Sequence, residues 1–447
     1  MISLVLLLGG CVAFNQALNA PISTSTGPAE TKTPPIETDT AIALAFSGGG
    51  TRAAAFALGV LQGLDRIPAR GGKSELDRVA FVSGVSGGSV AAAYFGLKGR
   101  AALSDFRERF LIRDAEAALR TDVSLGSLAQ GLEGGLNGAS RLSGWLDQNL
   151  FDGATMGELE RQSGPVVWLN ASDLYYRTPF LFSSTTFNAL CSDLKRFPVS
   201  QAVAASAAVP VVFTPIVLES FPQACADTPP AWIGRVLADR NAGAQVKAFA
   251  QALVSYRNPD QTRYLKLADG GLTDNFGLSG LVIARAAATN LYAPLTARDA
   301  VRLRKVTFVV VNAGRPPKGD WSRTIEGPAG ADLLSAITDT AIDSSVRSGF
   351  DAFRLTLREW EAAARKWRCG LALRDARALG AGNDWRCSNI SFEITEVSFA
   401  GSVASARLAA IPTRFKLPAD DVDLLIRAGQ DAVIADPVLN DGLRVTH

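Results

Sequence analysis

Histidine is almost absent from this 447-residue sequence, which contains only His447 at its last position. Histidine is the usual base that activates a serine nucleophile, and a terminal tail is a poor place for a catalytic group. A Ser-His-Asp triad and zinc hydrolysis through histidine ligands are therefore both disfavoured. A hydrolytic serine in this chain needs a carboxylate or a lysine as its base.

The start of the chain lacks a long hydrophobic run. Residues 2–8 are apolar but shorter than the roughly 20 residues of a membrane-spanning helix. They suit the apolar region of a secretory signal, and Leu8-Gly9-Gly10-Cys11 resembles the lipobox of bacterial lipoproteins. This resemblance implies a signal peptide over residues 1–10, an acylated Cys11, and a location in the bacterial cell envelope at the periplasmic face of the outer membrane. Because no Lys or Arg precedes the run, a chance apolar start in a cytoplasmic protein stays open.

Residues 11–40 are rich in Pro, Ser and Thr after the cysteine and show no apolar period. Such a composition predicts a flexible linker. Neither sign of charge is in excess, since 45 Lys and Arg stand against 43 Asp and Glu. Without a basic run or a zinc-type Cys/His cluster, the sequence argues against a nucleic-acid partner.

Cysteine is scarce, with four besides Cys11. An even number suits a disulfide framework in an exported protein. We predict the nearest-neighbour pairs Cys191–Cys225 and Cys369–Cys387. Buried free thiols are the alternative for a cytosolic enzyme.

Strand-like and helix-like segments alternate along most of the chain. The expected strands are residues 42–47, 79–83, 165–171, 180–184, 264–268 and 306–312. Alternation of this kind predicts an α/β fold with a largely parallel sheet covered on both faces, and sites in such sheets lie at the carboxyl ends of strands. Residues near 100–160 are expected to form a helical insertion.

Residues 331–368 are expected to form one or two long helices. Five apolar side chains fall on one face of this segment: Phe353, Leu357, Trp360, Ala364 and Trp367. Packing of this face on the sheet and contact with a lipid surface are the two interpretations.

Ser86 lies in Gly84-Val85-Ser86-Gly87-Gly88, between an expected strand and an alanine-rich helix. A serine there could simply cap the helix. The pattern also fits the G-x-S-x-G nucleophile elbow, a sharp turn that exposes the hydroxyl. Local sequence alone leaves both interpretations open.

Asp269 is the best candidate for a base, because it ends an apolar strand and precedes Gly270-Gly271. A simple Asp-Gly turn is the alternative, and Asp274 is a poorer candidate because it lies beyond the turn. The glycine triplet 48–50 could direct backbone N–H groups at an oxyanion. A phosphate-binding Walker loop needs Gly-Lys at this point, but Gly50 is followed by Thr51-Arg52. A dinucleotide-binding fingerprint needs a third glycine at the position where this sequence has Ala53.

The stretches LAFSGGGTRAAAFALGVLQGL, GVSGG, AASAAVPVVFTPI and DGGLTDNFGL occur in this order. Together they resemble the patatin-like phospholipase family over about residues 41–315. The resemblance implies a three-layer α/β/α sandwich and a Ser-Asp dyad that hydrolyses acyl esters of lipids without a metal or cofactor. Residues 316–447 are expected to be a helical and strand extension packed on the same domain.

The resemblance also implies residue roles. Ser86 is the expected nucleophile and Asp269 the expected base, while the backbone of Gly48, Gly49 and Gly50 is the expected oxyanion hole. Arg52 is expected to order the glycine loop. The remaining motif glycines are Gly84, Gly87, Gly88, Gly270 and Gly271. Ala53 departs from the glycine often found there, which leaves the course of the helix start uncertain.

The predicted function is a phospholipase A or lysophospholipase-like acyl hydrolase that acts on membrane lipid. An esterase or acyltransferase with a soluble acyl substrate is the near alternative. A lipid-binding envelope protein with a vestigial dyad is the non-enzymatic one.

Overall fold

The computed structural model describes residues 17–23, 36–119, 135–137, 139–161, 164–225, 227–315, 321–399, 402 and 404–440. The predicted signal peptide, Cys11 and His447 lie outside the described residues. Within these ranges no helix is both long and apolar enough to cross a membrane.

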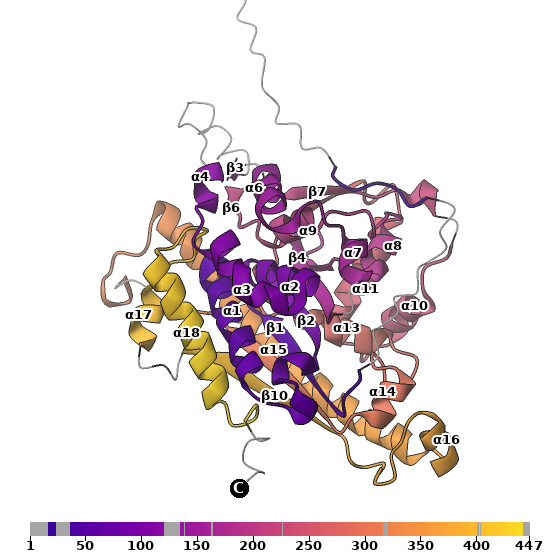
Figure 1. Ribbon diagram of the computed structural model, residues 1–447. Helices are drawn as coiled ribbons and strands as arrows, with labels where there is room; N and C mark the ends of the chain where they lie inside the picture. The colour runs from indigo at the N-terminus through magenta and orange to yellow at the C-terminus, as the bar shows by residue number, and fades with distance from the viewer. Residues whose placement is uncertain are drawn as a thin grey trace, which may run out of the picture.

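An eight-stranded sheet forms the centre of the fold, in the order β10-β9-β1-β2-β4-β8-β7, with β5 paired to β4 (Figure 1). Neighbours from β10 to β4 are parallel, whereas β8 is antiparallel to both β4 and β7. The strands are β1 (Thr40–Phe46), β2 (Val79–Val85), β4 (Val166–Asp173), β5 (Thr178–Leu181), β7 (Ile216–Glu219), β8 (Tyr264–Asp269), β9 (Lys305–Asn312) and β10 (Ser391–Ser398). Each predicted strand is present, and the sheet is largely parallel as expected.

Helices cover both faces of this sheet. They are α1 (Gly50–Arg66), α2 (Gly87–Lys98), α3 (Ala102–Phe106), α4 (Ala115–Leu119), α6 (Ala139–Leu146), α7 (Met156–Arg161), α8 (Ser184–Ala189), α9 (Val199–Ser206), α10 (Ala231–Ala238), α11 (Ala244–Tyr256), α12 (Gly271–Asp274), α13 (Ser279–Ala287), α14 (Ala297–Arg302), α15 (Gly330–Cys369), α16 (Leu373–Ala378), α17 (Ser405–Ala410) and α18 (Ala419–Ala435).

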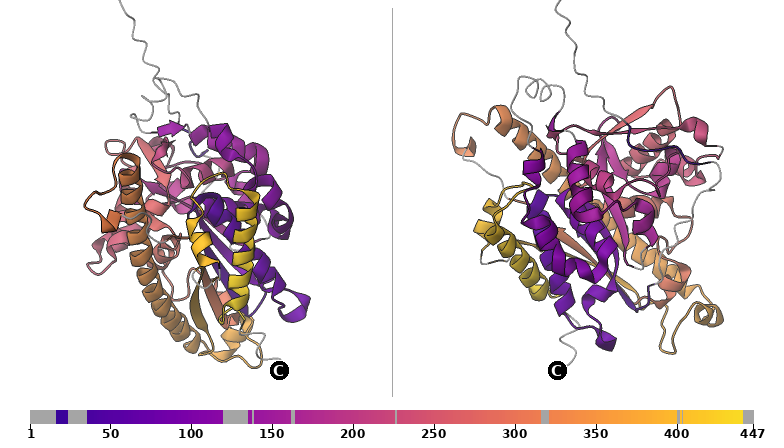
Figure 2. Two further views of the ribbon diagram at one scale, coloured as in Figure 1. Left: turned by 90° about the vertical axis from the view of Figure 1, so that its left-hand side faces the viewer. Right: turned by 45° about the horizontal axis from the view of Figure 1, so that its top comes forward.

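Strand β1 shows how the layers are built, because alternate residues of a strand point to opposite faces. Leu44 and Phe46 belong to a core with α1, α2 and α18, whereas Ala43 and Ala45 belong to a second core with α13 and α15. The left view of Figure 2 shows α15 and α18 on opposite sides of the sheet. The three-layer α/β/α sandwich is confirmed.

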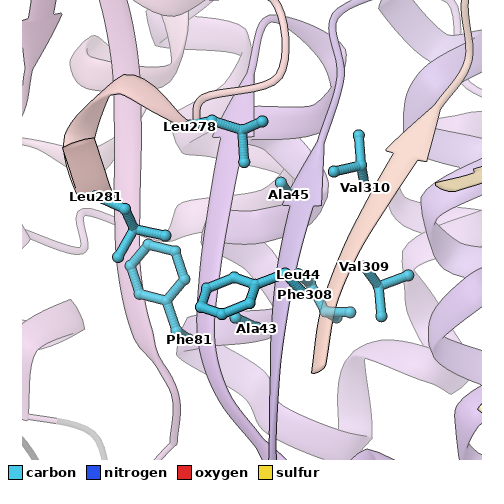
Figure 3. A pocket seen from close by; sticks show the side chains of 9 residues that line it. All are labelled: Ala43, Leu44, Ala45, Phe81, Leu278, Leu281, Phe308, Val309 and Val310. Atoms are coloured by element: carbon cyan, nitrogen blue, oxygen red, sulfur yellow. The ribbon is translucent and has the colours of Figure 1, made fainter. Parts of the chain in front are cut away.

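The second core is tightly packed. A narrow gap there is lined by apolar side chains of β1, β2 and β9 and by Leu278 and Leu281 (Figure 3). It leaves no space for even one water molecule. This gap therefore cannot hold an acyl chain.

The long helix α15 lies across the second core. Phe353, Leu357, Trp360 and Ala364 are buried there with β1 and β9, and Trp367 contacts the ring of Tyr292. The face predicted from the sequence therefore packs on the sheet, and the lipid-contact interpretation of that face is wrong.

The helical insertion packs into the main core. Phe106, Phe110, Leu142 and Leu146 are fully buried there. A two-residue ladder joins β3 (Gly135–Asn137) to β6 (Val211–Phe213) outside the main sheet.

The segment after residue 316 completes the domain that contains the central sheet. Strand β10 adds to the sheet beside β9, and α18 packs closely on α1. A Cβ on Gly59 would lie 2.1 Å from the Ile426 carbonyl oxygen, and one on Gly429 would lie 2.4 Å from that of Phe56. Because the two backbones approach so closely, the extension and α1 are one packing unit.

Both predicted disulfides, Cys191–Cys225 and Cys369–Cys387, are present.

Part of the segment predicted to be a flexible linker is docked on the domain: residues 17–23 lie against it. The Leu18 N–H donates to the Val217 carbonyl of β7, and the Asn19 side chain accepts the Glu219 N–H. Strand β7 is an edge strand, so its unpaired backbone groups account for this docking.

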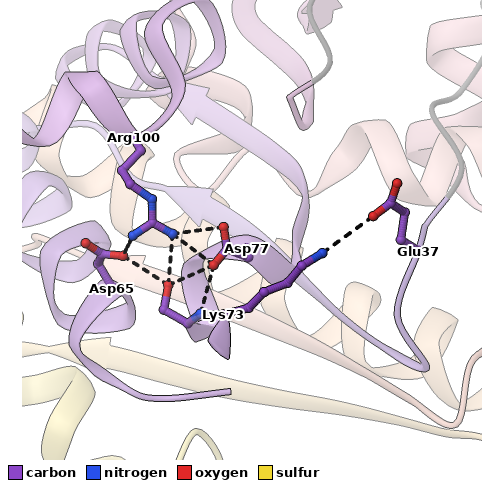
Figure 4. A network of polar contacts seen from close by, with 6 residues as sticks. Glu37, Asp65, Lys73, Asp77 and Arg100 are labelled. Carbon is purple, nitrogen blue, oxygen red and sulfur yellow. Dashed lines mark hydrogen bonds and ion pairs between the residues drawn. The ribbon is translucent and has the colours of Figure 1, made fainter. Parts of the chain in front are cut away.

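A polar network ties together the amino-terminal side of β2 (Figure 4). Arg100 bonds to Asp65 at the end of α1 and to both carboxylate oxygens of Asp77 at 2.8 Å. The Ser74 hydroxyl also donates to Asp65. These groups are partly exposed, so each pair contributes little by itself.

Candidate active site

Ser86 lies in a sharp turn between β2 and α2. Its φ of 52° and ψ of −123° are unusual for a residue with a side chain, and such strain persists only where surrounding contacts impose it. The Ser86 N–H donates to the Ser206 hydroxyl at 2.8 Å, and that hydroxyl donates to the Asn170 carbonyl at 2.6 Å. The Ser86 side chain makes no capping hydrogen bond to α2. The helix-cap interpretation therefore does not explain this serine.

The glycines around Ser86 are required by close backbone packing. A Cβ on Gly87 would lie 1.9 Å from the Gly50 carbonyl oxygen, and one on Gly88 would lie 2.5 Å from that of Phe46. A Cβ on Gly84 would lie 2.7 Å from the Gly88 carbonyl oxygen. The Ser86 turn and the glycine loop after β1 therefore touch backbone to backbone.

Asp269 ends β8 and hydrogen-bonds with the Ser86 side chain, although 183 positions separate the two residues. Its Oδ1 accepts the Gly271 N–H at 2.8 Å. Burial raises the pKa of Asp269 to about 6, while the hydrogen bonds from Gly271 and Ser86 act in the opposite direction. The carboxyl group is thus ionised near neutral pH and more basic than an ordinary aspartate.

The turn after Asp269 has little room for side chains. A Cβ on Gly270 would lie 2.4 Å from the Asn170 carbonyl oxygen, and one on Gly271 would lie 3.0 Å from Asp269 Oδ1. Both glycines let the turn approach β4 and the carboxylate.

The three backbone N–H groups of the glycine loop are not equivalent. The Gly48 N–H faces the side-chain oxygen of Asn275 at 3.1 Å and its backbone oxygen at 3.3 Å. Within the described part of the chain, the N–H groups of Gly49 and Gly50 have no acceptor. Both glycines have positive φ, at 140° and 60°. The candidate oxyanion donors of this loop are therefore the N–H groups of Gly49 and Gly50, because Asn275 already accepts the N–H of Gly48.

Arg52 lies buried behind this loop, 3% exposed. It donates to the carbonyls of Ala313 and Ile411, each at 3.0 Å. Burial lowers the pKa of Arg52 to about 9, with a smaller contribution from Arg315. The guanidinium is still charged at neutral pH, and it joins the loop's helix to two distant segments.

Residues 411–416 of the extension also contact the loop. The Arg414 carbonyl accepts the Thr51 N–H at 2.8 Å, and a Cβ on Gly50 would lie 2.6 Å from the same oxygen. The Arg414 side chain pairs with Glu116 at 2.7 Å, and Lys416 pairs with Asp114. The extension thus bridges the insertion and the start of α1.

Sequence reasoning missed three positioning residues: Ser206, Asn275 and Arg414. The first two fall inside stretches that carry the family resemblance, AASAAVPVVFTPI and DGGLTDNFGL, and a search for buried polar residues there could have found them. Arg414 acts through its backbone, so its side chain gives no signal in the sequence.

Comparison with known protein families identifies one matching family. The family model described as patatin-like phospholipase matches residues 44–282, more than half of the chain. No curated protein matches the sequence significantly.

Solved structures of human GIVD cytosolic phospholipase A2 are similar to this chain at low identity. One superimposes with a TM-score of 0.45 at 11% identity, covering 91% of this chain and 62% of that one. The same enzyme in complex with methyl gamma-linolenyl fluorophosphonate gives a TM-score of 0.37 at 12% identity, covering 91% and 58%. The chain thus spans about three fifths of those proteins. By its family match, the chain belongs to the patatin-like phospholipase family.

Proposed function

We propose that this protein is a serine acyl hydrolase of lipids, of the phospholipase A or lysophospholipase type. The observation that carries the proposal is the hydrogen bond between Ser86 and the buried Asp269, whose pKa is raised to about 6. A general base works best when its pKa lies near the working pH. The chain's one histidine is its last residue, so a carboxylate base fits the composition as well.

The reaction follows from these positions. Asp269 accepts the Ser86 proton as the hydroxyl oxygen attacks the ester carbonyl, and the resulting acid protonates the leaving alcohol. Water then attacks the acyl-serine while Asp269 again takes a proton, which releases the fatty acid and restores Ser86. The N–H groups of Gly49 and Gly50 stabilise the oxyanion in both steps, and each such donor is typically worth about 3–4 kcal/mol.

Arg52 and Asn275 act as positioning residues in this proposal. Asn275 holds the Gly48 amide, and Arg52 fixes the start of α1 through Ala313 and Ile411. Neither residue needs to touch the substrate. Their buried contacts keep two amides directed at the space beside Ser86.

Two alternatives share the same residues. An esterase or acyltransferase would use the dyad on a soluble acyl group, and a lipid-binding protein would have a dyad that no longer reacts. A fluorophosphonate probe separates the second from an enzyme, because only an activated serine is labelled. We expect stoichiometric labelling of the wild-type chain at Ser86 and none of Ser86→Ala. A chain that stays unlabelled while folded would overturn the proposal.

A hydrolysis screen then identifies the substrate class. Phospholipid vesicles, lysophospholipids and short p-nitrophenyl esters are compared at equal acyl concentration. We expect higher turnover on the lipids. A preference for short soluble esters would favour the esterase alternative, and acyl transfer to an added alcohol in place of water would favour the acyltransferase.

We further propose that Cys11 carries the lipid anchor of an envelope lipoprotein. The support is the lipobox-like Leu8-Gly9-Gly10-Cys11 after a short apolar run. Several acyl chains on one cysteine give firm membrane attachment. Cys11→Ser should move the protein from the membrane to the soluble fraction of its native host. An intact mass with an unmodified Met1 would contradict this location.

A further inference from the structure

The first half of α15 is less buried than the second half. Between residues 330 and 350, none of the side chains whose burial is described is buried. From Phe353 onward, buried side chains recur at helical spacing as far as Arg368. A 40-residue helix thus has a second half with buried side chains and a first half whose described side chains are exposed or only partly buried.

This less buried half extends past the candidate active site. The Ser345 hydroxyl donates to the Gly271 carbonyl, two residues after Asp269. Farther along α15, Phe353 contacts Phe308 in the middle of β9, and Trp360 contacts Phe392 near the start of β10. The helix therefore runs antiparallel to these strands, and the turns before Ser345 extend beyond their carboxyl ends by about 22 Å at 1.5 Å per residue.

Large apolar side chains are exposed on this part of the chain. Trp321 is 45% exposed, Ile325 101%, Leu333 46% and Ile337 57%. They are four of the twelve exposed large hydrophobic residues found in the described ranges. Both views of Figure 2 show the segment before α15 beside the first turns of the helix, at the opposite end of the molecule from α16. We call residues 321–344 the α15 arm.

The charges of the arm do not favour an anionic partner. Arg323 is its one basic residue, against four acidic ones: Glu326, Asp332, Asp339 and Asp343. Attraction to an acidic surface or to nucleic acid would require the opposite balance. A neutral apolar partner fits the exposed side chains, and exposed apolar patches commonly mark interaction sites.

The amino-terminal segment points toward the same end of the molecule. Leu18 pairs with Val217 and the next residue pairs with Glu219, so the described segment runs parallel to β7 with its start toward Ile216. Ile216 pairs with Leu267, two residues before Asp269. Leu18 lies seven positions after Cys11, and that length spans at most about 25 Å. An anchor at Cys11 would therefore hold the active-site end near the membrane.

We propose that the α15 arm docks on a lipid surface by inserting its exposed apolar side chains, which brings the Ser86–Asp269 end of the sheet against that surface. The inference rests on the proposed lipid substrate, but the binding step does not require catalysis. The arm lies outside residues 44–282, the part of the chain that the family model matches.

Vesicle co-sedimentation tests this proposal. The parent is the full chain carrying Ser86→Ala and Cys11→Ser, so that neither hydrolysis nor an acyl anchor contributes. Phosphatidylcholine vesicles are the probe. Leu333→Ser with Ile337→Ser should reduce the partition coefficient by about tenfold or more, because each buried apolar side chain contributes substantially to transfer out of water.

The matched control is Leu355→Ser with Leu373→Ser. These side chains are 58% and 56% exposed, and they lie on the packed half of α15 and on α16. We expect parent-like binding by the control and, because all four side chains are exposed, an unchanged unfolding midpoint for both variants. Binding should also persist at high salt, since it does not depend on charge.

Several results would overturn the proposal. They are a parent that does not bind neutral vesicles, equal losses in the arm and control variants, and binding that needs anionic lipid and disappears at high salt. A concentration-dependent dimer that only the arm substitutions abolish, without vesicle binding, would assign the arm to a second copy of the chain. Each of these outcomes leaves fluorophosphonate labelling of the wild type untouched, so a failed arm is distinguishable from a failed catalytic proposal.

Discussion

The backbone N–H of Gly48 donates to the side-chain oxygen of Asn275 at 3.1 Å. Asn275 follows the short helix after Asp269, and a Cβ on Gly271 would lie 2.8 Å from the same Asn275 oxygen. One amide side chain therefore joins the glycine loop to the turn that carries the proposed base. In the proposed mechanism, the position of the oxyanion donors relative to Ser86 and Asp269 depends on this contact.

Asn275→Ala should lower kcat by about 10- to 100-fold with little change in KM. The reason is that loss of one direct oxyanion donor costs about 100- to 1,000-fold, and Asn275 acts indirectly through Gly48. Steady-state kinetics on a dispersed ester provide the measurement. A rise in KM of about 10- to 100-fold with an unchanged kcat would show that Asn275 contributes to substrate binding instead.

Asn275→Asp serves as the companion variant. It keeps an acceptor for Gly48 but adds a negative charge near Asp269, and a like charge raises the pKa of a carboxyl group. The acid limb of its rate profile should therefore move to higher pH than in the wild type. An acid limb that stays in place would show that a charge at position 275 does not act on the Asp269 carboxyl group.

Gly87→Ala should reduce turnover by about 100-fold or more and destabilise the fold by about 1–3 kcal/mol, as overpacking typically does. Its Cβ would lie 1.9 Å from the Gly50 carbonyl oxygen, so the glycine loop must shift. Gly234→Ala in α10 is the matched control, because no atom lies within 4 Å of its Cβ position. Denaturant unfolding and kcat together check both variants, and equal effects at the two sites would contradict the packing argument.

The strands and the two catalytic candidates could be predicted because their signals are local. Ser86 and Asp269 each end an apolar strand and precede glycines, and carboxyl ends of neighbouring strands meet at one edge of a sheet. The Gly48–Asn275 contact joins residues 227 positions apart. No local sequence pattern shows that this contact engages the Gly48 N–H and leaves those of Gly49 and Gly50 as the candidate oxyanion donors.

The sequence predicts which segments form helices and strands better than it predicts which surfaces are exposed and which are covered by another segment. Apolar periodicity identified α15 and its packed face, but exposure of Leu333 and Ile337 depends on where the sheet ends beneath the helix. Residues 17–23 were expected to be part of a linker, because their composition says nothing about the edge of β7. Their docking depends on the strand order, which places β7 at the edge of the sheet.

If Ser86 and Asp269 act as a dyad, the rate losses caused by replacing each of them should not be additive. Ser86→Ala and Asp269→Asn should each abolish most of the hydrolysis, and the double variant should be hardly worse than either, because residues that act as a unit share one loss. Initial rates on a sensitive fluorogenic ester allow the residual activity to be compared. Losses that multiply in the double variant would mean that the two residues act independently.

The pH dependence of kcat/KM should show an acid limb near pH 6. Asp269 accepts a proton only when ionised, and burial raises its pKa to about 6, so the rate should rise with pH through this range. Deletion of His447 should leave the limb unchanged, which distinguishes the carboxylate from an imidazole of similar pKa. A limb that disappears on deletion of His447 would assign the base to the histidine.

The same burial predicts that Asp269→Asn stabilises the folded protein near neutral pH. In the unfolded chain the carboxyl ionises near its ordinary pKa of 3.8, whereas in the folded chain it ionises only at about 6. The folded state therefore loses stability as pH rises from about 4 to 6, and the loss is complete above 6. At about 1.4 kcal/mol for each pKa unit, it approaches about 3 kcal/mol.

Asparagine removes this cost, because it is neutral and its oxygen can still accept the Gly271 N–H that Asp269 accepts. At pH 8 the free energy of unfolding of Asp269→Asn should exceed that of the wild type by up to about 3 kcal/mol, whereas at pH 4 the two should agree. Asp260→Asn, at an exposed turn, should show no gain at either pH. Urea unfolding at both pH values decides the matter: a gain of equal size at pH 4 and pH 8, or none at pH 8, would show that the Asp269 carboxylate is not held at a cost to the fold.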